Sequence, residues 1–126
     1  MATINGDNNA NVLDGTGFDD VIDARGGDDE VEAGFGDDLV FGGSGDDHIV
    51  GDRGTDRLNG GADDDILVGG FGNDTLNGGD GDDILVGGSG NGDDSLGRDT
   101  SGRSPIRRRR GSPRRLTAAD PPPSGR

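Results

Sequence analysis

An acidic residue recurs at every ninth position along most of this 126-residue chain. With the nine-residue unit numbered from Gly6, the sixth position holds Asn11 and then Asp20, Asp29, Asp38, Asp47, Asp56, Asp65, Asp74 and Asp83. The fourth position holds glycine at Gly27, Gly36, Gly45, Gly54, Gly72 and Gly81. Carboxylates and the backbone carbonyls that glycine turns leave accessible are the oxygen ligands that a hard cation such as Ca²⁺ prefers. The spacing therefore predicts a series of cation sites with these residues as ligands.

An aliphatic residue at the eighth position of every unit indicates how the acids are held. The series is Leu13, Ile22, Val31, Val40, Ile49, Leu58, Leu67, Leu76 and Leu85. Positions seven to nine read as short β-strands, and the glycine-rich positions one to five read as turns that need positive φ. Because a three-residue strand is not stable alone, we expect the strands to stack in parallel and bury the eighth side chain in one interior. Two units per coil give about 18 residues, so the predicted fold is all-β: a parallel β-roll, or two-sheet solenoid.

Units two apart in sequence lie one above the other in such a roll, which sorts the acids onto two edges. One edge would carry Asp20, Asp38, Asp56 and Asp74, and the other Asn11, Asp29, Asp47, Asp65 and Asp83. Successive Asp pairs then give three sites on each edge. Asn11 with Asp29 would add a weaker seventh site. Asp94, in a tenth unit that follows a two-residue insertion at Ser89–Gly90, would add an eighth with Asp74. We expect most acids at the fifth position to be solvated.

Composition divides the chain into two segments. Residues 1–97 contain 24 acidic residues and 3 arginines, whereas residues 98–126 contain 9 arginines and 2 aspartates. The first segment is predicted to be the roll. The second is rich in Arg, Pro and Ser without hydrophobic periodicity and is predicted to be a disordered tail. The absence of cysteine excludes disulfides and thiolate-bound zinc. The first residues lack the basic and apolar regions of a secretory signal, and no stretch reaches membrane-spanning length.

The arginine-rich tail allows three interpretations. The run Arg107–Arg110 would contact phosphates or other anionic surfaces, although no aromatic residues interleave with it and we expect no specific nucleic-acid recognition. Alternatively, the tail folds back onto the acidic roll through charge attraction. A third interpretation is out-of-frame translation, because the repeat gives way abruptly to Arg-, Pro- and Ser-rich sequence.

The units "GGFGNDTLN", "GGDGDDILV" and "GGSGDDHIV" resemble the nonapeptide GGxGxDxUx of the RTX, or haemolysin-type, calcium-binding repeats. The resemblance implies a calcium-loaded parallel β-roll in a secreted bacterial protein that passes unfolded through a one-step exporter, without an N-terminal signal peptide. On this basis we expect a non-enzymatic structural or secretion-assisting module that binds about six to eight Ca²⁺ ions. No nucleophile–base pair or zinc motif is present. Alternatives are the accessory part of a secreted protease, lipase or polysaccharide epimerase, and a surface or matrix adhesin.

The low apolar content predicts that folding depends on the ion. Only 26% of the residues are hydrophobic, and the buried aliphatics offset little of the entropy cost of ordering the chain. Repulsion among the acids adds to that cost. We therefore expect an unfolded calcium-free chain and a cooperative roll in calcium, with dissociation constants of about 10⁻⁴–10⁻³ M.

Several side chains depart from the repeat. Phe18 and Asp63 replace glycine at the fourth position; Asp tolerates positive φ, whereas Phe does so poorly, so the turn at Phe18 is predicted to be modified. Phe35 and Phe71 fall at third positions two coils apart on one edge, where we expect them to cover the turn surface. One outer sheet face is apolar toward its C-terminal end and is a candidate surface for self-association or a partner domain. Its residues are His48, Val50, Ile66, Val68, Ile84 and Val86.

Overall fold

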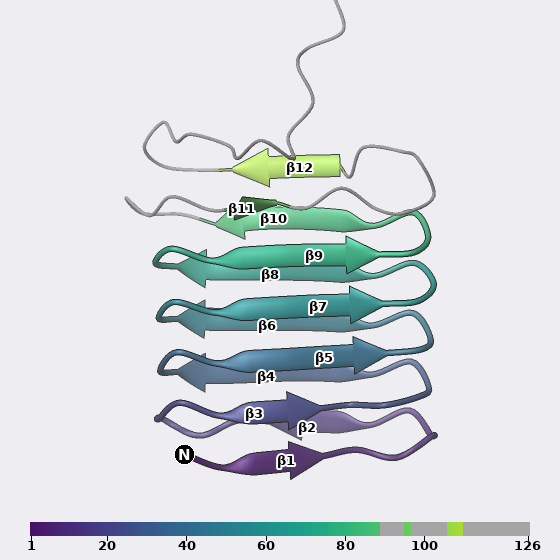
Figure 1. The fold of residues 1–126 in the computed structure, drawn as a ribbon, viewed down its shortest axis with the longest axis horizontal. Coiled ribbons are helices and arrows are strands. Elements are labelled where there is room, and N and C mark those ends of the chain that lie inside the picture. Colours follow the sequence, from purple (N-terminus) through teal and green to yellow (C-terminus); the bar gives the residue numbers. More distant parts are fainter. Residues whose placement is uncertain (89–94, 97–105, 110–126) are drawn as a thin grey trace, which may run out of the picture.

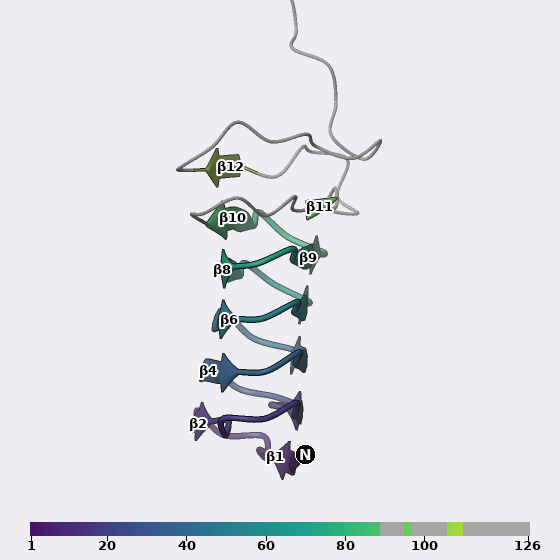
Figure 2. The same cartoon turned by 90° about the vertical axis from the view of Figure 1, so that its left-hand side faces the viewer.

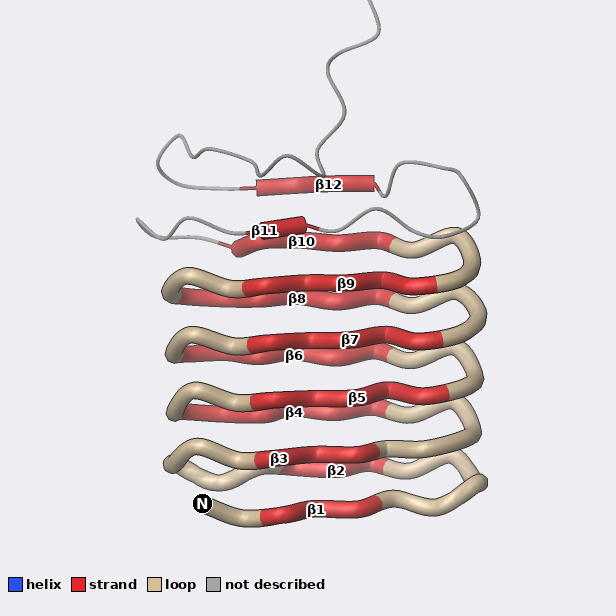
Figure 3. Tube along the Cα trace, in the orientation of Figure 1, coloured by secondary structure: helices blue, strands red, loops and turns tan. Residues whose placement is uncertain are grey.

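The computed structural model describes residues 1–88, 95–96 and 106–109, and every regular element in these residues is a β-strand. The strands are β1 (Thr3–Asn5), β2 (Val12–Asp14), β3 (Val21–Asp23), β4 (Glu30–Phe35), β5 (Leu39–Gly43), β6 (His48–Arg53), β7 (Arg57–Gly61), β8 (Ile66–Phe71), β9 (Thr75–Gly79), β10 (Ile84–Gly88), β11 (Ser95–Leu96) and β12 (Ile106–Arg109). Odd-numbered strands form one six-stranded sheet and even-numbered strands the other (Figure 1). Figure 2 shows the two sheets edge-on, facing each other, and the trace in Figure 3 follows the chain coil by coil.

Strand pairing repeats every 18 residues. Val31 pairs with Ile49 in one sheet, and Leu58 pairs with Leu76 in the other, both in parallel register. Parallel neighbours need a crossover connection, and here each crossover is a strand of the opposite sheet with its two turns. This register confirms the predicted parallel β-roll of two nine-residue units per coil.

The eighth-position aliphatics form one continuous core between the sheets. Eight of them, from Ile22 to Leu85, are at most 1% exposed, and Ala24 and Ala33 are buried beside them. Leu13 packs against the core but is only partly buried, as is Ile4 in β1. Ile4 lies nine residues before Leu13, so the repeat begins one unit earlier than the numbering from Gly6 predicted.

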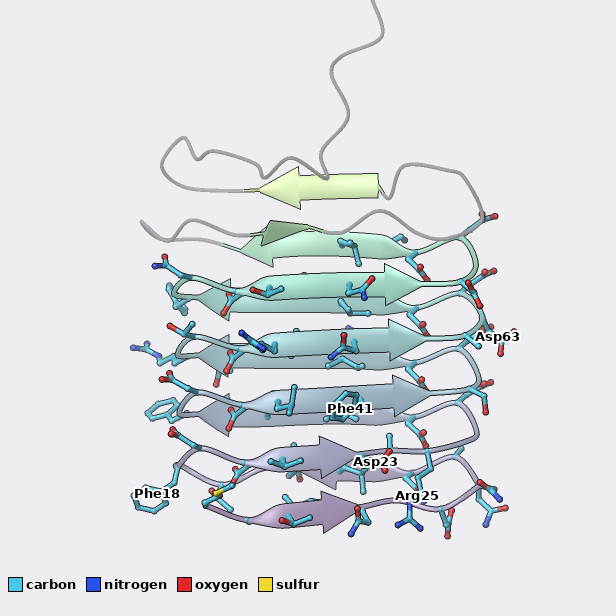
Figure 4. The ribbon with its side chains drawn as sticks, in the orientation of Figure 1. Phe18, Asp23, Arg25, Phe41 and Asp63 are labelled. Atoms are coloured by element: carbon cyan, nitrogen blue, oxygen red, sulfur yellow. The ribbon has the colours of Figure 1, made fainter. Side chains whose placement is uncertain are left out.

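The turns form two edges of the roll. We call the turns after β1, β3, β5, β7 and β9 the acidic edge, and the turns after β2, β4, β6 and β8 the phenylalanine edge. Figure 4 labels Asp63 on the acidic edge and Phe18 on the phenylalanine edge, at opposite sides of the roll.

Turn geometry explains the glycines at the fourth position. All six predicted glycines have φ between 95° and 133°, a region that favours residues without a Cβ. Asp63 takes the same conformation with φ 74°, as expected for Asp. Phe18 avoids positive φ, and its turn is instead held by Thr16, whose backbone N–H donates to Asp20 Oδ2 at 2.6 Å. The prediction of a modified turn at Phe18 is therefore confirmed.

The strand lengths differ from the sequence-based expectation. β4, β6 and β8 contain six residues each, because pairing continues past the ninth position into the next unit, as in Gly34 with Asp52. Within the predicted disordered tail, the structure describes only β12, which pairs in parallel with β10. A strand forms there because the edge of β10 leaves backbone groups open to a further partner; the remaining tail residues lie outside the described ones. No helix in the described part is long and apolar enough to cross a membrane.

The predicted apolar face lies on the outside of the β4-β6-β8-β10 sheet. His48, Ile66 and Ile84 are in register with one another across these strands. Ile66 is 40% exposed, and Ile84 is partly buried. The existence of a partner for this face stays a prediction.

Candidate metal sites

The eight aspartates at the sixth position are buried. Each is at most 3% exposed. A buried carboxylate is costly unless its charge and its oxygen atoms find partners. The residues are Asp20, Asp29, Asp38, Asp47, Asp56, Asp65, Asp74 and Asp83.

One oxygen of each carboxylate is bound by the backbone. Asp65 Oδ1 accepts the N–H of Asp47 at 2.8 Å, and Asp56 Oδ1 accepts the N–H of Asp38 at 2.9 Å. The same bond, always from the residue 18 positions earlier, links Asn11, Asp29, Asp47, Asp65 and Asp83 on the acidic edge and Ala2, Asp20, Asp38, Asp56 and Asp74 on the phenylalanine edge. The structure therefore stacks the predicted residues into two columns, with the pairings that the sequence predicted.

The second oxygen of most carboxylates has no protein partner. Oδ2 of five of them is buried without a hydrogen bond, and each such atom has a desolvation cost of about 1–3 kcal/mol or more. The five are Asp29, Asp38, Asp47, Asp56 and Asp65. A buried, anionic oxygen without a donor is suited to a bound cation.

A glycine keeps the space beside this second oxygen open. At Gly51, a Cβ would lie 2.5 Å from Asp56 Oδ2 and 2.7 Å from the carbonyl oxygen of Gly69, one coil further along. Gly42 repeats the arrangement with Asp47 Oδ2 and the Gly60 carbonyl. Carboxylate and carbonyl oxygens thus converge at a point that only glycine leaves free, since a Cβ there would clash with both oxygens. These hard oxygen donors suit Ca²⁺.

Ala24 and Ala33 occupy the corresponding first position ahead of Asp29 and Asp38, and both alanines are fully buried. The turns that contain these two carboxylates, in the coil of residues 24–41, therefore have less space beside Oδ2 than the turns with glycine at the first position.

Burial raises the pKa of the central carboxyls. It brings the pKa of Asp38 and Asp47 to about 6, that of Asp56 to about 7 and that of Asp65 to about 8, with neighbouring acids adding to the rise. Backbone N–H groups oppose the shift but do not cancel it. Without cations, the folded roll therefore favours protonation of Asp65, and of Asp56 in part, near neutral pH.

Asp20 differs from the five aspartates whose Oδ2 has no hydrogen-bond partner. Burial alone would raise its pKa, but hydrogen bonds from Thr16 and Ala2 outweigh that effect and place the pKa below its usual value. Thr16 Oγ1 lies 2.8 Å from Asp20 Oδ2, so the protein itself supplies partners for this second oxygen. Asp20 is thus less dependent on a cation than the five aspartates whose Oδ2 has no partner.

The fifth-position acids form a second, exposed ladder. On the acidic edge, Asp28 Oδ1 accepts the N–H of Asp46, and Asp46 Oδ1 accepts the N–H of Asp64, at 2.9 and 3.0 Å. On the phenylalanine edge, Asp37 Oδ1 accepts the N–H of Thr55 at 2.8 Å. Their exposure agrees with the expected solvated surface, but the sequence did not predict these bonds between coils.

The structure describes the residues of the predicted seventh site but not all of those of the eighth. Asn11 lies below Asp29 and donates its N–H to Asp29 Oδ1 at 2.7 Å, while its own Oδ1 accepts the N–H of Asp7. Asp94 lies outside the described residues. No group of three or more Asp, Glu, His or Cys side chains converges within the described ranges, so an ion in these turns would need backbone carbonyls to complete its ligands.

The repeat matches a known family. The family model for the RTX calcium-binding nonapeptide repeat matches four overlapping stretches, residues 5–40, 32–67, 41–76 and 59–94. Among curated proteins, no sequence matches the chain. RTX repeats bind calcium and are typical of secreted bacterial proteins. With matches across most of its length and a parallel β-roll of stacked glycine–aspartate turns, this chain belongs to the RTX calcium-binding nonapeptide repeat family.

Proposed function

We propose that the chain binds several Ca²⁺ ions in two columns, one along each edge of the roll, and that this binding is coupled to folding. The observation that carries the proposal is the row of buried Oδ2 atoms without hydrogen-bond partners, at Asp29, Asp38, Asp47, Asp56 and Asp65. When bound, Ca²⁺ supplies positive charge and oxygen coordination at these atoms.

The ligands proposed are the sixth-position carboxylates and glycine carbonyls, both those of the fourth position that the sequence predicts and those of the first position, such as Gly69 near Asp56 Oδ2. On each edge, aspartates 18 residues apart lie in neighbouring stacked turns, and each such pair defines one proposed site. The two edges together have six of these Asp pairs. Asn11 with Asp29 would form a weaker seventh site, and Asp74 with Asp94 an eighth.

Coupled folding follows from the charge of the roll. Residues 1–97 contain 24 acids against 3 arginines, and the buried carboxyls of the folded form lack counter-charges. Ions would bind the stacked turns of the folded roll but not the turns of the unfolded chain. The free energy of ion binding therefore adds directly to the free energy of folding.

The wider role is proposed on the same basis. The roll, ending near Gly97, acts as a non-enzymatic module that stays unfolded at low calcium, passes through a one-step exporter and folds in calcium outside the cell. The apolar outer face around Ile66 is the observation that favours a second candidate, docking to a partner domain or a surface layer.

Circular dichroism during a calcium titration of the full chain tests the function, with Mg²⁺ as the control cation. We expect little β signal in chelator and a cooperative rise in Ca²⁺ but not in equal Mg²⁺, because Mg²⁺ is smaller and releases its water reluctantly. A β signal already complete in chelator at pH 8 would contradict coupled folding.

A further inference from the structure

The two edges of the roll carry different charge around equivalent buried aspartates. At the second to fifth turn positions, the five turns of the acidic edge have seven acids and one arginine, whereas the four turns of the phenylalanine edge have three acids and one arginine. The acids of the acidic edge are Asp7, Asp28, Asp46, Asp63, Asp64, Asp80 and Asp82, and those of the phenylalanine edge are Asp19, Asp37 and Asp52.

The difference is concentrated in the middle of the roll. The fifth position on the acidic edge is Asp in four successive coils, from Asp28 to Asp82. On the phenylalanine edge, Thr55 and Asn73 take that position in the two later coils. The field that attracts a divalent cation is therefore weaker at Asp56 than at Asp65.

A fixed cation strengthens this asymmetry. The Arg53 guanidinium carbon lies 5.5 Å from the centre of the Phe35 ring and 5.0 Å from that of the Phe71 ring, so the guanidinium lies between two aromatic rings, one from the coil before its own and one from the coil after it. Cation–π contacts of this kind hold a charge in place. Arg53 is in the same turn as Asp56. On the acidic edge, Arg25 instead forms a long 3.9 Å pair with Asp23, and both side chains are about half exposed.

Resting on the proposed calcium function, we propose that the two edges are two classes of calcium site. The sites of the acidic edge, such as Asp47 with Asp65, fill at lower free calcium and drive folding. The sites of the phenylalanine edge beside Arg53, which lie between Asp38, Asp56 and Asp74, fill at higher free calcium. The guanidinium held between the two rings repels the ion, and its charge already offsets part of the repulsion among the carboxylates.

The size of the Arg53 effect follows from its single charge. A unit charge one Debye length, about 10 Å, from a divalent ion in water changes the binding constant by about two- to fourfold. The missing acids at Thr55 and Asn73 act in the same direction.

Two matched substitutions test the proposal. Asp65→Asn and Asp56→Asn change two equivalent buried residues, which are 1% and 0% exposed. In each, Oδ1 accepts the backbone N–H of the residue 18 positions earlier. Asn keeps that acceptor and removes one ligand charge. We expect Asp65→Asn to raise the calcium midpoint of the circular dichroism transition at least threefold or to abolish folding, and Asp56→Asn to move it less than twofold.

Bound calcium is measured in parallel by equilibrium dialysis of the full chain. In the wild type we expect ions to keep binding after the β signal is complete, and Asp56→Asn to remove these late ions. Arg53→Gln should move the late phase to two- to fourfold lower free calcium, whereas Arg57→Gln, which removes the same charge from the outer face of β7, should not.

The outcomes separate the inference from the function beneath it. If calcium folds the wild type but the two aspartate variants are equally impaired, or Arg53→Gln behaves like Arg57→Gln, the two-class proposal is overturned and the calcium function stands. If calcium has no effect on the wild-type chain, both are overturned.

Discussion

Gly54→Ala is expected to destabilise the roll strongly through a single methyl group. Gly54 occupies the fourth position of its turn with φ 133°, where residues with a Cβ are strained. A Cβ built there would also overlap the carbonyl of Gly36 in the coil below, with the carbonyl carbon only 2.6 Å away. Both obstacles are backbone, so no side-chain rotation relieves them.

The magnitude is the sum of two terms. The left-handed conformation costs about 1–2 kcal/mol for a residue with a Cβ, and forcing the stacked turns apart adds about 1–3 kcal/mol. A loss of about 2–5 kcal/mol, divided over about three acidic-edge ions that bind with folding, raises the calcium midpoint by about three- to seventeenfold, since 1.36 kcal/mol is a factor of ten per ion.

Gly17→Ala is the matched control on the same edge. Gly17 has no positive φ, and no heavy atom lies within 4 Å of the added methyl. Calcium titration followed by circular dichroism, and urea unfolding in saturating calcium, should leave Gly17→Ala near the wild type. Equal behaviour of the two alanine variants would refute the close stacking of turns on which the site geometry depends.

Three further predictions concern protons, the core and the first unit. In chelator, β structure should grow as pH falls from 8 to 4.5. The pKa of Asp is near 3.8 in the unfolded chain, but in the folded chain that of Asp56 is about 7 and that of Asp65 about 8, so the folded chain holds more protons. The stability that these protons contribute is fully present below the unfolded pKa and is lost as pH rises through the folded pKa values. Circular dichroism across this range measures it, and β structure that grows with rising pH would contradict the assignment. Leu67→Ala, at a fully buried position, should cost about 2–5 kcal/mol by urea unfolding in calcium, against less than about 0.5 kcal/mol for exposed Thr75→Ala; equal costs would argue against the shared core. Asn11→Asp should move binding of the seventh ion to lower free calcium in equilibrium dialysis, because a carboxylate replaces an amide in a turn whose N–H already bonds Asp29 Oδ1; an unchanged binding curve would remove the seventh site.

The coil length and the sorting of acids onto two edges could be predicted because both depend only on periodicity. The eighth-position aliphatics required an interior, and 18 residues per coil then placed Asp47 below Asp65. Ile4 was missed because the residues before Gly6 lack the glycines and the acid of the unit, although its spacing of nine from Leu13 was a usable signal. Arg53 was also missed: Phe35, Arg53 and Phe71 share the coil spacing, but their stacking depends on side-chain rotamers that spacing does not determine.

The hydrogen bonds of the aspartates could not be predicted from their spacing either, and they separate geometry from ion binding. Oδ1 of each buried aspartate bonds the backbone of the coil below, as Asp56 does with the N–H of Asp38, which fixes the distance between turns whether or not a cation is present. Oδ2 of Asp56 has no such partner and is the atom that a cation would neutralise. The same side chain thus aligns successive coils and makes their alignment unstable until its charge is compensated, by protons in acid or, as proposed, by Ca²⁺ at neutral pH.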